Sequence, residues 1–285
     1  MEKRLLRRKD PIILLGTHRS GTSLLGELLS DIGVFMGRKQ NAHHEAWHFL
    51  DNNKKILDIA HSDWDLPLVF ESLLKSETTL KAVVQYMQSE TTSHKMIRHF
   101  FGRRLALKEK ISPSQTPWGW KDPRTNITFP LWYQIYPDAR FIMLIRNGVD
   151  VANSLKVREG QKLTRIHSRA TSTRCQTLDE SFRLWEEYNE FFIRYRNIIP
   201  EDKILTIKYE DLLTSSHENL EIISDFLDLE NHEDFIRMAS LRINPDNANK
   251  FRNDSELVEF YYEVRNSYWM KELGYSDIPG IRKTA

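Results

Sequence analysis

Residues 11–29 constrain the fold of this chain more than any other stretch. An apolar run from Ile12 to Leu15 ends at Gly16 and is typical of a strand buried on both faces. From Ser23 onward, leucines recur at helical spacing. A strand, a small-residue loop and a helix start in this order direct backbone N–H groups and the helix dipole into one concavity. The stretch therefore predicts an anion-binding loop, and phosphate is the usual ligand of such a loop.

The loop has almost the spacing of a Walker A motif, G-x-x-x-x-G-K-[ST], with Gly16, Gly21 and Ser23 in register. The lysine is missing because Thr22 occupies its position, and a cation stands at Arg19 instead. A nucleotide triphosphatase without this lysine loses the charge that reaches the β- and γ-phosphates. A loop that only holds one phosphate and places a cation beside a different leaving group does not need this lysine. An ordinary strand–turn–helix connection is the alternative interpretation.

The composition is typical of a soluble enzyme with one domain. The 285 residues are near the upper limit for a single hydrophobic core, and a net charge of +1 provides no overall field for nucleic acid or a membrane. The single cysteine, Cys175, excludes an internal disulfide or a cysteine zinc cage and fits a reducing compartment. No apolar run approaches the length of a membrane span, and residues 1–10 are basic without the apolar region of a signal peptide. We expect an exposed arm on a cytoplasmic protein.

Residues 44–48, His-Glu-Ala-Trp-His, match the H-E-x-x-H pattern of zinc hydrolases. On a helix, His44 and His48 would share one face, with Glu45 as a base. The nearby sequence offers no third ligand at a defined spacing. The alternatives are histidines without a metal, or Glu45 facing the phosphate loop as a general base, with His43 or His44 as less favoured candidates.

Residues 61–117 show mixed helical patterns and predict a helical insertion on the acceptor side. Basic side chains cluster in it, at Lys95, Arg98, His99, Arg103, Arg104, Lys108 and Lys110. This cluster is either a solvated face or a lid for an acidic acceptor. The next apolar stretch ends in Lys-Asp-Pro-Arg at 121–124, where Pro123 forces the preceding residue out of helical conformation. Because ligands gather at the carboxyl ends of parallel strands, we expect a functional role for Lys121; a Lys–Asp ion pair at a turn is the alternative.

Residues 139–145 form the clearest strand after the first. Arg146 stands at its carboxyl end, and Asn147 or Asp150 can cap the helix that follows. Ser154 lies one turn beyond Asp150 on the same helix face. A guanidinium and a hydroxyl that converge suit a second phosphate, because arginine can hold it with two parallel hydrogen bonds.

The remaining sequence completes an α/β pattern. A long amphipathic helix over 178–199 precedes a fourth strand over 203–209. Residues 216–285 are mostly helical, with helices expected over 220–227, 235–241 and 257–273, and a polar loop over 244–252. The order of elements predicts a doubly wound parallel sheet of about four to five strands, with a P-loop-like phosphate-binding loop and helical insertions, in a single domain over 1–285.

Three segments together resemble the sulfotransferases that use 3′-phosphoadenosine 5′-phosphosulfate (PAPS). Residues 16–24, GTHRSGTSL, are similar to the 5′-phosphosulfate loop of that family. Residues 145–154, IRNGVDVANS, are similar to its 3′-phosphate motif, and KYEDL at 208–212 to a segment after a late strand. Arg19 and Lys-Asp-Pro at 121–123 look closer to the tyrosylprotein and carbohydrate branches than to the cytosolic phenol and steroid branch. The glycine-rich C-terminal cofactor loop of the cytosolic branch is absent.

The resemblance implies transfer of a sulfuryl group from PAPS to a hydroxyl or amine of an acceptor, by in-line displacement and without a metal. The acceptor would be a carbohydrate, a lipid or other small molecule, or a protein tyrosine, and not a nucleic acid. Backbone amides of Ser20, Gly21, Thr22, Ser23 and Leu24 would hold the 5′-phosphate, and Arg19 and Lys121 would neutralise the bridging oxygen. The other expected contacts with PAPS are Arg146 and Ser154 at the 3′-phosphate, then Tyr209, Lys250 and Arg252.

Glu45 would take the proton of the acceptor in this mechanism. Three other classes stay open from the sequence. One is a P-loop-type kinase or nucleotide triphosphatase, and a second is a zinc hydrolase through His44, Glu45 and His48. The third is a protein that binds the nucleotide without catalysing transfer.

Overall fold

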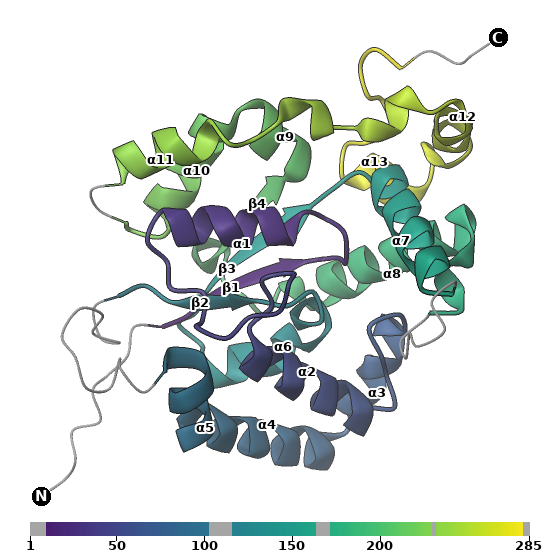
Figure 1. Cartoon of the computed structure of the whole chain (residues 1–285). Helices are drawn as coiled ribbons and strands as arrows, with labels where there is room; N and C mark the ends of the chain where they lie inside the picture. Colours follow the sequence, from purple (N-terminus) through teal and green to yellow (C-terminus); the bar gives the residue numbers. More distant parts are fainter. Residues whose placement is uncertain (1–9, 103–115, 164–171, 230–231, 282–285) are drawn as a thin grey trace, which may run out of the picture.

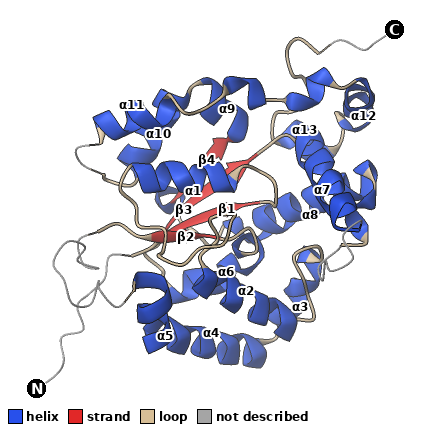
Figure 2. Cartoon of the chain, in the orientation of Figure 1, coloured by secondary structure: helices blue, strands red, loops and turns tan. Residues whose placement is uncertain are grey.

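In the part of the chain that the structure describes, four parallel strands form the centre, in the order β2-β1-β3-β4 (Figures 1 and 2). The strands are β1 (Ile12–Gly16), β2 (Gly119–Lys121), β3 (Arg140–Ile145) and β4 (Ile204–Lys208). This computed structural model describes residues 10–102, 116–163, 172–229 and 232–281. The predicted arm over 1–10 lies outside them except for Asp10, as do Arg103, Arg104, Lys108 and Lys110.

Helices cover both faces of the sheet, because side chains alternate between the faces along each buried strand. Ile12 and Leu14 belong to one core, whereas Ile13 and Leu15 belong to the other. The first core is covered by α1 (Thr22–Asp31), α9 (Tyr209–Thr214), α10 (Ser216–Phe226) and α11 (Glu233–Ser240). The second is covered by α2 (Trp47–Ile59), α6 (Thr125–Ile135) and α8 (Leu178–Arg196). The predicted doubly wound parallel sheet is confirmed.

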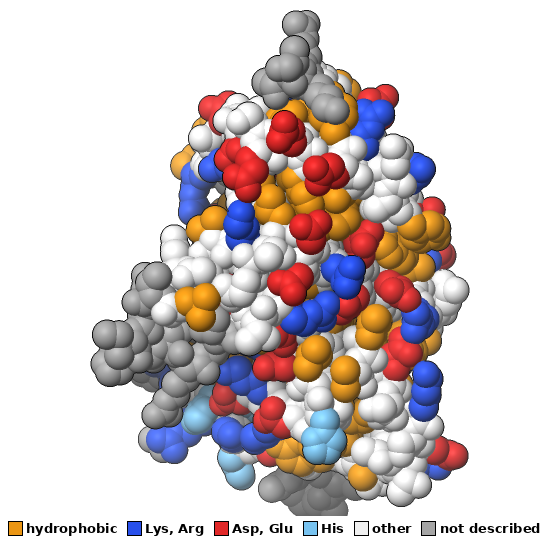
Figure 3. All heavy atoms as spheres, turned by 90° about the vertical axis from the view of Figure 1, so that its right-hand side faces the viewer, with side chains coloured by type: hydrophobic (Ala, Val, Ile, Leu, Met, Phe, Trp, Pro, Cys, Tyr) orange, Lys and Arg blue, Asp and Glu red, His pale blue; other side chains and the backbone are white. Residues whose placement is uncertain are grey.

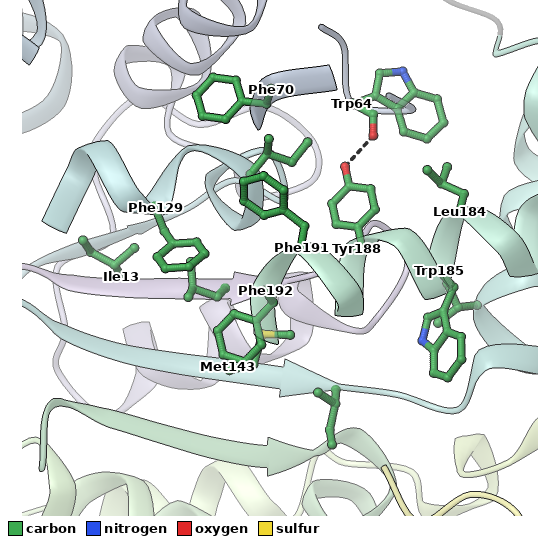
Figure 4. Packing of buried hydrophobic residues seen from close by; sticks show 14 of the residues in the cluster. Ile13, Trp64, Phe70, Phe129, Met143, Leu184, Trp185, Tyr188, Phe191 and Phe192 are labelled. Carbon is green, nitrogen blue, oxygen red and sulfur yellow. Dashed lines mark hydrogen bonds between the residues drawn. The ribbon is translucent and has the colours of Figure 1, made fainter. Parts of the chain in front are cut away.

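The aromatic residues of α8 belong to the second core or pack against it, and they form the apolar face of the amphipathic helix that the sequence predicts. Figure 4 shows Phe191 and Phe192 packed toward Phe129 of α6 and Met143 of β3. In the same view the hydroxyl of Tyr188 donates a hydrogen bond to the carbonyl oxygen of Trp64, at 2.5 Å. This contact fixes Trp64 against α8, beside the site described below.

The described part of residues 61–117 is helical, as predicted. It contains α3 (Glu71–Lys75), α4 (Glu77–Thr92), α5 (His94–Met96) and a π-helical turn over 97–101. Along the rest of the chain lie α7 (Gly148–Leu163), α12 (Ser255–Val264) and α13 (Tyr268–Glu272).

The single helix expected over 257–273 is wrong, because the chain breaks between α12 and α13. Ser267 has extended backbone angles there (φ −61°, ψ 158°) and begins the second helix. Asn and Ser compete for backbone hydrogen bonds and so favour helix boundaries over helix interiors, which explains a break at Asn266 and Ser267.

The described surface shows the charge balance of the sequence. In Figure 3, acidic and basic side chains are interspersed over the face that lies on the right-hand side of Figure 1. Within the described ranges, no helix combines the length and the apolar character needed to cross a bilayer.

Candidate active site

Two adjoining hollows lie beside the loops that follow β1 and β3. The loop pocket has a volume of about 240 Å³ and is lined by Gly21, Thr22, Ser23 and Lys121, among others. The outer cleft has a volume of about 950 Å³. Their walls share His18, Arg19, His43, Glu45, Arg146, Arg158 and Tyr209. The strands β2 and β3 lie on opposite sides of β1, so the connections of the chain diverge at the carboxyl end of β1. Ligands of parallel sheets usually bind at such a point.

The loop after β1 runs from Gly16, at the end of that strand, to the start of α1 at Thr22. Gly21 has a φ of +97°, which a residue with a side chain rarely adopts. A Cβ atom at this position would lie only 2.3 Å from ring carbons of Tyr209, so the loop backbone packs directly against that ring. The first N–H groups of α1 have no partner within the helix, and they follow directly after Gly21.

The loop after β1 and the motif after β3 meet directly. The Nε of Arg19 donates a hydrogen bond to Ser154 Oγ at 2.8 Å, and Arg146 Nη1 donates to the carbonyl oxygen of Arg19 at 3.1 Å. The guanidinium of Arg146 also lies 4.4 Å from the centre of the Tyr209 ring. Arg19 and Arg146 therefore lie on the same side of the molecule, with Ser154 and Tyr209 beside them. Burial, followed by the nearby charges of Arg158 and Arg146, lowers the pKa of Arg19.

Several contacts fix the backbone around Arg146. Its carbonyl oxygen accepts a hydrogen bond from Trp185 Nε1 at 3.1 Å. The next N–H, of Asn147, donates to Glu210 Oε1 at 3.1 Å, and Asn147 Oδ1 accepts from the N–H of Val149 at 2.8 Å. Asn147 thus caps α7, as the sequence suggested. Since Trp185 belongs to α8 and Glu210 to α9, two separate helices position this arginine.

Lys121, at the end of β2, is buried and points toward the loop pocket. Its Nζ donates hydrogen bonds to the carbonyl oxygen of His43 at 2.9 Å and to Ser23 Oγ at 3.1 Å, and lies 3.5 Å from Glu45 Oε1. Burial lowers the pKa of Lys121, although the charge of Glu45 opposes this shift. The alternative of a Lys–Asp pair at the turn is wrong, because the Asp122 carboxylate bonds to Arg124 and Asn53 instead.

Glu45 lines both hollows beside His43. Its second oxygen, Oε2, accepts a hydrogen bond from Asn41 Nδ2 at 2.7 Å. The carboxylate is therefore held between an amide and the Lys121 ammonium. Burial lowers the pKa of His43, so its ring is neutral near pH 7.

The zinc interpretation of His44, Glu45 and His48 is wrong. His44 has a left-handed backbone (φ 58°) and precedes α2, so it does not share a helix face with His48. Its Nε2 pairs with Glu27 Oε1 at 2.9 Å. His48 is buried beside Asn52, and burial lowers its pKa to about 4. Over the described ranges, no group of three or more His, Cys, Asp or Glu side chains could hold a metal ion.

The two C-terminal candidates lie in different places. Lys250 lines the outer cleft, because the N–H of the buried Phe251 donates to Asp150 Oδ1 at 2.9 Å and draws this segment against α7. Arg252 is exposed, and it is not among the described residues that line either hollow. The side chains of Ser20 and Leu24 also line neither hollow, so only the backbone amides of these two residues are candidates.

Sequence reasoning missed His18, Arg158 and other residues of the outer cleft, such as Trp47 and Lys54. Arg158 follows Ser154 by four residues, so the helical period of α7 was a usable signal for it. His18 lies within the loop motif but had no assigned role. None of the described residues of 61–117 lines the outer cleft; Trp47 and Lys54 of α2 do so instead.

A parallel sheet with a glycine loop after its first strand, and a basic cleft at the point where the crossovers diverge, defines a P-loop-like α/β protein. A sulfotransferase family model matches residues 11–234, which is most of the chain. The chain therefore belongs to the sulfotransferase family, whose reaction is the transfer of a sulfuryl group.

Solved structures of sulfotransferases support the fold. A sulfotransferase from Alicyclobacillus acidocaldarius is 18% identical, with a TM-score of 0.51, over 95% of this chain and 98% of that one. A sulfotransferase domain from the curacin biosynthetic pathway is 14% identical, with a TM-score of 0.50, over 96% of this chain and all of that one (100%). A sequence search among curated proteins gave no match.

Proposed function

We propose that this sulfotransferase uses PAPS as its donor and transfers the sulfuryl group to a hydroxyl or amine of an acceptor. The observation that supports this proposal is that two groups of cations and hydrogen-bond donors meet in one cleft. One site consists of the backbone amides at the start of α1, with the Lys121 ammonium at the end of β2 beside them. The start of α7 offers Arg146 and Ser154, and Arg19 lies between the two sites. A nucleotide with phosphates at both its 5′ and 3′ positions fits this pair of sites.

The residues present fit PAPS in their chemistry. Both sites consist mainly of donors, namely N–H groups, guanidinium groups, an ammonium and hydroxyls, as phosphate oxygens require. The contact between Gly21 and the Tyr209 ring leaves no room for a side chain at the loop, so the backbone can approach a phosphate closely. Lys250, at the rim of the outer cleft, adds a further cation for the nucleotide.

PAPS, when bound, supplies an activated sulfuryl group and a phosphate leaving group. Lys121 and Arg19 lie at the loop and would stabilise the charge that develops on the leaving oxygen. Glu45 lies beside Lys121 and would take the proton of the acceptor, with the neutral ring of His43 as the other candidate. A sulfuryl group carries less negative charge than a phosphoryl group, so fixed cations and amides suffice where a phosphoryl transferase uses a metal clamp.

A P-loop kinase or nucleotide triphosphatase is the second candidate, and the contacts of Ser23 disfavour it. In a Walker A loop the hydroxyl at this position binds Mg²⁺. Here Ser23 Oγ accepts from the Lys121 ammonium and donates to the carbonyl oxygen of His43 at 3.0 Å. A cation already occupies the place beside this hydroxyl, and Thr22 stands where the Walker lysine would be.

Calorimetric titration with 3′-phosphoadenosine 5′-phosphate (PAP), ADP and Mg-ATP tests this proposal. PAP is expected to bind about 10 to 100 times more tightly than ADP, because only PAP has the 3′-phosphate that Arg146 and Ser154 can bind. Equal affinities for PAP and ADP, or preferential binding of Mg-ATP, would contradict the assignment of PAPS as donor.

Replacing Arg146 with Ala is expected to weaken PAP binding by about 10 to 100-fold, because a charge-assisted pair of hydrogen bonds to the 3′-phosphate is lost. Affinity for ADP should change much less. Arg140→Ala is a matched control, since Arg140 stands at the opposite end of β3 and pairs with Asp228. If calorimetry finds the PAP affinity of Arg146→Ala unchanged, Arg146 does not bind the 3′-phosphate.

A further inference from the structure

The junction of the two hollows contains a cation that the proposed contacts with PAPS do not use. Arg158 lines both the loop pocket and the outer cleft. It follows Ser154 by four residues on α7, so it lies one turn, about 6 Å, farther along the helix than the 3′-phosphate site. Its charge therefore lies beyond the assigned 3′-phosphate site along α7, where the two hollows meet.

Arg158 is held rigidly and with a surplus of positive charge. Its guanidinium lies 4.5 Å from the centre of the Trp64 ring, and its Nε donates to Glu159 Oε1 at 2.6 Å. The same oxygen of the fully buried Glu159 accepts from Lys162 Nζ at 2.8 Å. One carboxylate thus accepts from two cations, and the walls that the two hollows share carry Arg19, Arg146 and Arg158 against the single carboxylate of Glu45. A guanidinium fixed by an aromatic ring and a carboxylate is preorganised to hold an anion.

His18 lies at the same junction, and one of its ring nitrogens has no hydrogen-bond partner among the described residues. Its side chain is only 7% exposed and lines both hollows, and its Nε2 makes no hydrogen bond within the described part of the chain. A buried polar atom without a partner is costly, which indicates that a bound group completes the site. Burial lowers the pKa of His18 well below its ordinary value, and nearby cations lower it further, so the ring is neutral. These cations are Arg158, Arg124, Lys121 and Lys162.

We propose that this junction binds an anionic group of the acceptor, a carboxylate, sulfate or phosphate near the hydroxyl or amine that receives the sulfuryl group. The guanidinium of Arg158 and a ring N–H of His18 are the donors to this group. The proposal rests on the proposed function, because it assigns the phosphates of the nucleotide to the other cations of the cleft. It makes the enzyme selective for acidic over neutral acceptors.

The test is a calorimetric titration of the PAP-saturated protein with inorganic sulfate. The wild-type protein is expected to bind sulfate, and Arg158→Met should weaken this binding by about tenfold or more through loss of a charge-assisted contact. Lys156→Met is the matched control, because Lys156 is on the same helix, pairs with Glu256 and lines neither hollow. That variant should bind sulfate as the wild type does. The binding of PAP itself is measured first, so a failure of the proposed function is seen separately.

A second variant covers the case in which Arg158→Met does not fold. His18→Phe keeps the edge-on packing against Trp64, where the ring centres are 4.8 Å apart, and removes the ring nitrogens. It too should bind PAP normally and sulfate more weakly. Selenate soaked into crystals of the PAP complex should give an anomalous peak between Arg158 and His18.

Three results would overturn the proposal. The first is that the PAP-saturated wild type binds no sulfate, or binds selenate only beside Lys121. The second is that sulfate affinity is unchanged in both Arg158→Met and His18→Phe. The third is that Arg158→Met weakens binding of PAPS but not of PAP, because Arg158 would then serve the sulfuryl group of the donor.

Discussion

A Glu45→Gln variant is expected to transfer sulfuryl groups about 10²–10⁴ times more slowly than the wild type, the usual contribution of a general base. Glutamine keeps the size of the side chain and can still accept a hydrogen bond from Lys121, but it cannot take a proton. PAP affinity should be nearly unchanged, because the phosphates are assigned to other residues. Release of PAP from PAPS in the presence of hydroxyl acceptors measures the rate.

The choice of acceptor separates a base from a merely structural residue. A phenol that is already ionised at the assay pH, such as 4-nitrophenol, needs no base, so the defect of Glu45→Gln should shrink with it. Glu27→Gln makes the same chemical change on α1, outside both hollows, and should leave the rate of sulfuryl transfer unchanged. A defect of the same size with every acceptor would assign Glu45 to positioning Lys121. A larger defect in His43→Gln than in Glu45→Gln would make His43 the base.

A Gly21→Ala variant is expected to lose measurable PAP binding and to be destabilised by about 2 to 5 kcal/mol. The added Cβ would lie 2.3 Å from ring carbons of Tyr209, and the φ of +97° is strained for alanine. The ring cannot move without disturbing Arg146, whose guanidinium lies against it. Calorimetry with PAP and urea unfolding measure the two effects.

Gly33→Ala is the matched control for this variant. Gly33 has nearly the same φ, +98°, but a Cβ there would meet nothing within 4 Å. It should therefore show the backbone strain alone, about 1 kcal/mol or slightly more, with normal PAP binding. A double variant, Gly21→Ala with Tyr209→Ala, should recover part of the lost stability. Equal behaviour of Gly21→Ala and Gly33→Ala would show that the contact with Tyr209 is unimportant.

Local patterns in the sequence were enough for the strands, the loop after β1 and the start of α7. The run from Ile12 to Leu15 can be buried on both faces only in a sheet with helices on each side. Gly16 and Gly21 mark a loop that needs unusual backbone angles, and Asn147 marks a helix start. These features depend on residues within a few positions of one another, so spacing is sufficient to find them.

The same patterns failed where the backbone departed from the expected period. Because His44 has a left-handed backbone, the H-E-x-x-H residues do not lie on one helix face. Ser267 has extended backbone angles and divides one expected helix into two. Nothing in the alternation of apolar and polar residues signals such single-residue changes. The position of Lys250 likewise depends on the hydrogen bond between Phe251 and Asp150, which joins segments about a hundred residues apart in sequence.

The sequence by itself determined that this protein has a parallel α/β core, a glycine loop after its first strand and an arginine after its third. The tertiary structure decided which side chains share a cleft: Arg19 with Ser154, Lys121 with Glu45, and Arg158 with His18. The physical reason is that strand order places these residues together. The order β2-β1-β3-β4 brings the ends of β1, β2 and β3 to one edge of the sheet, and no local period specifies that order.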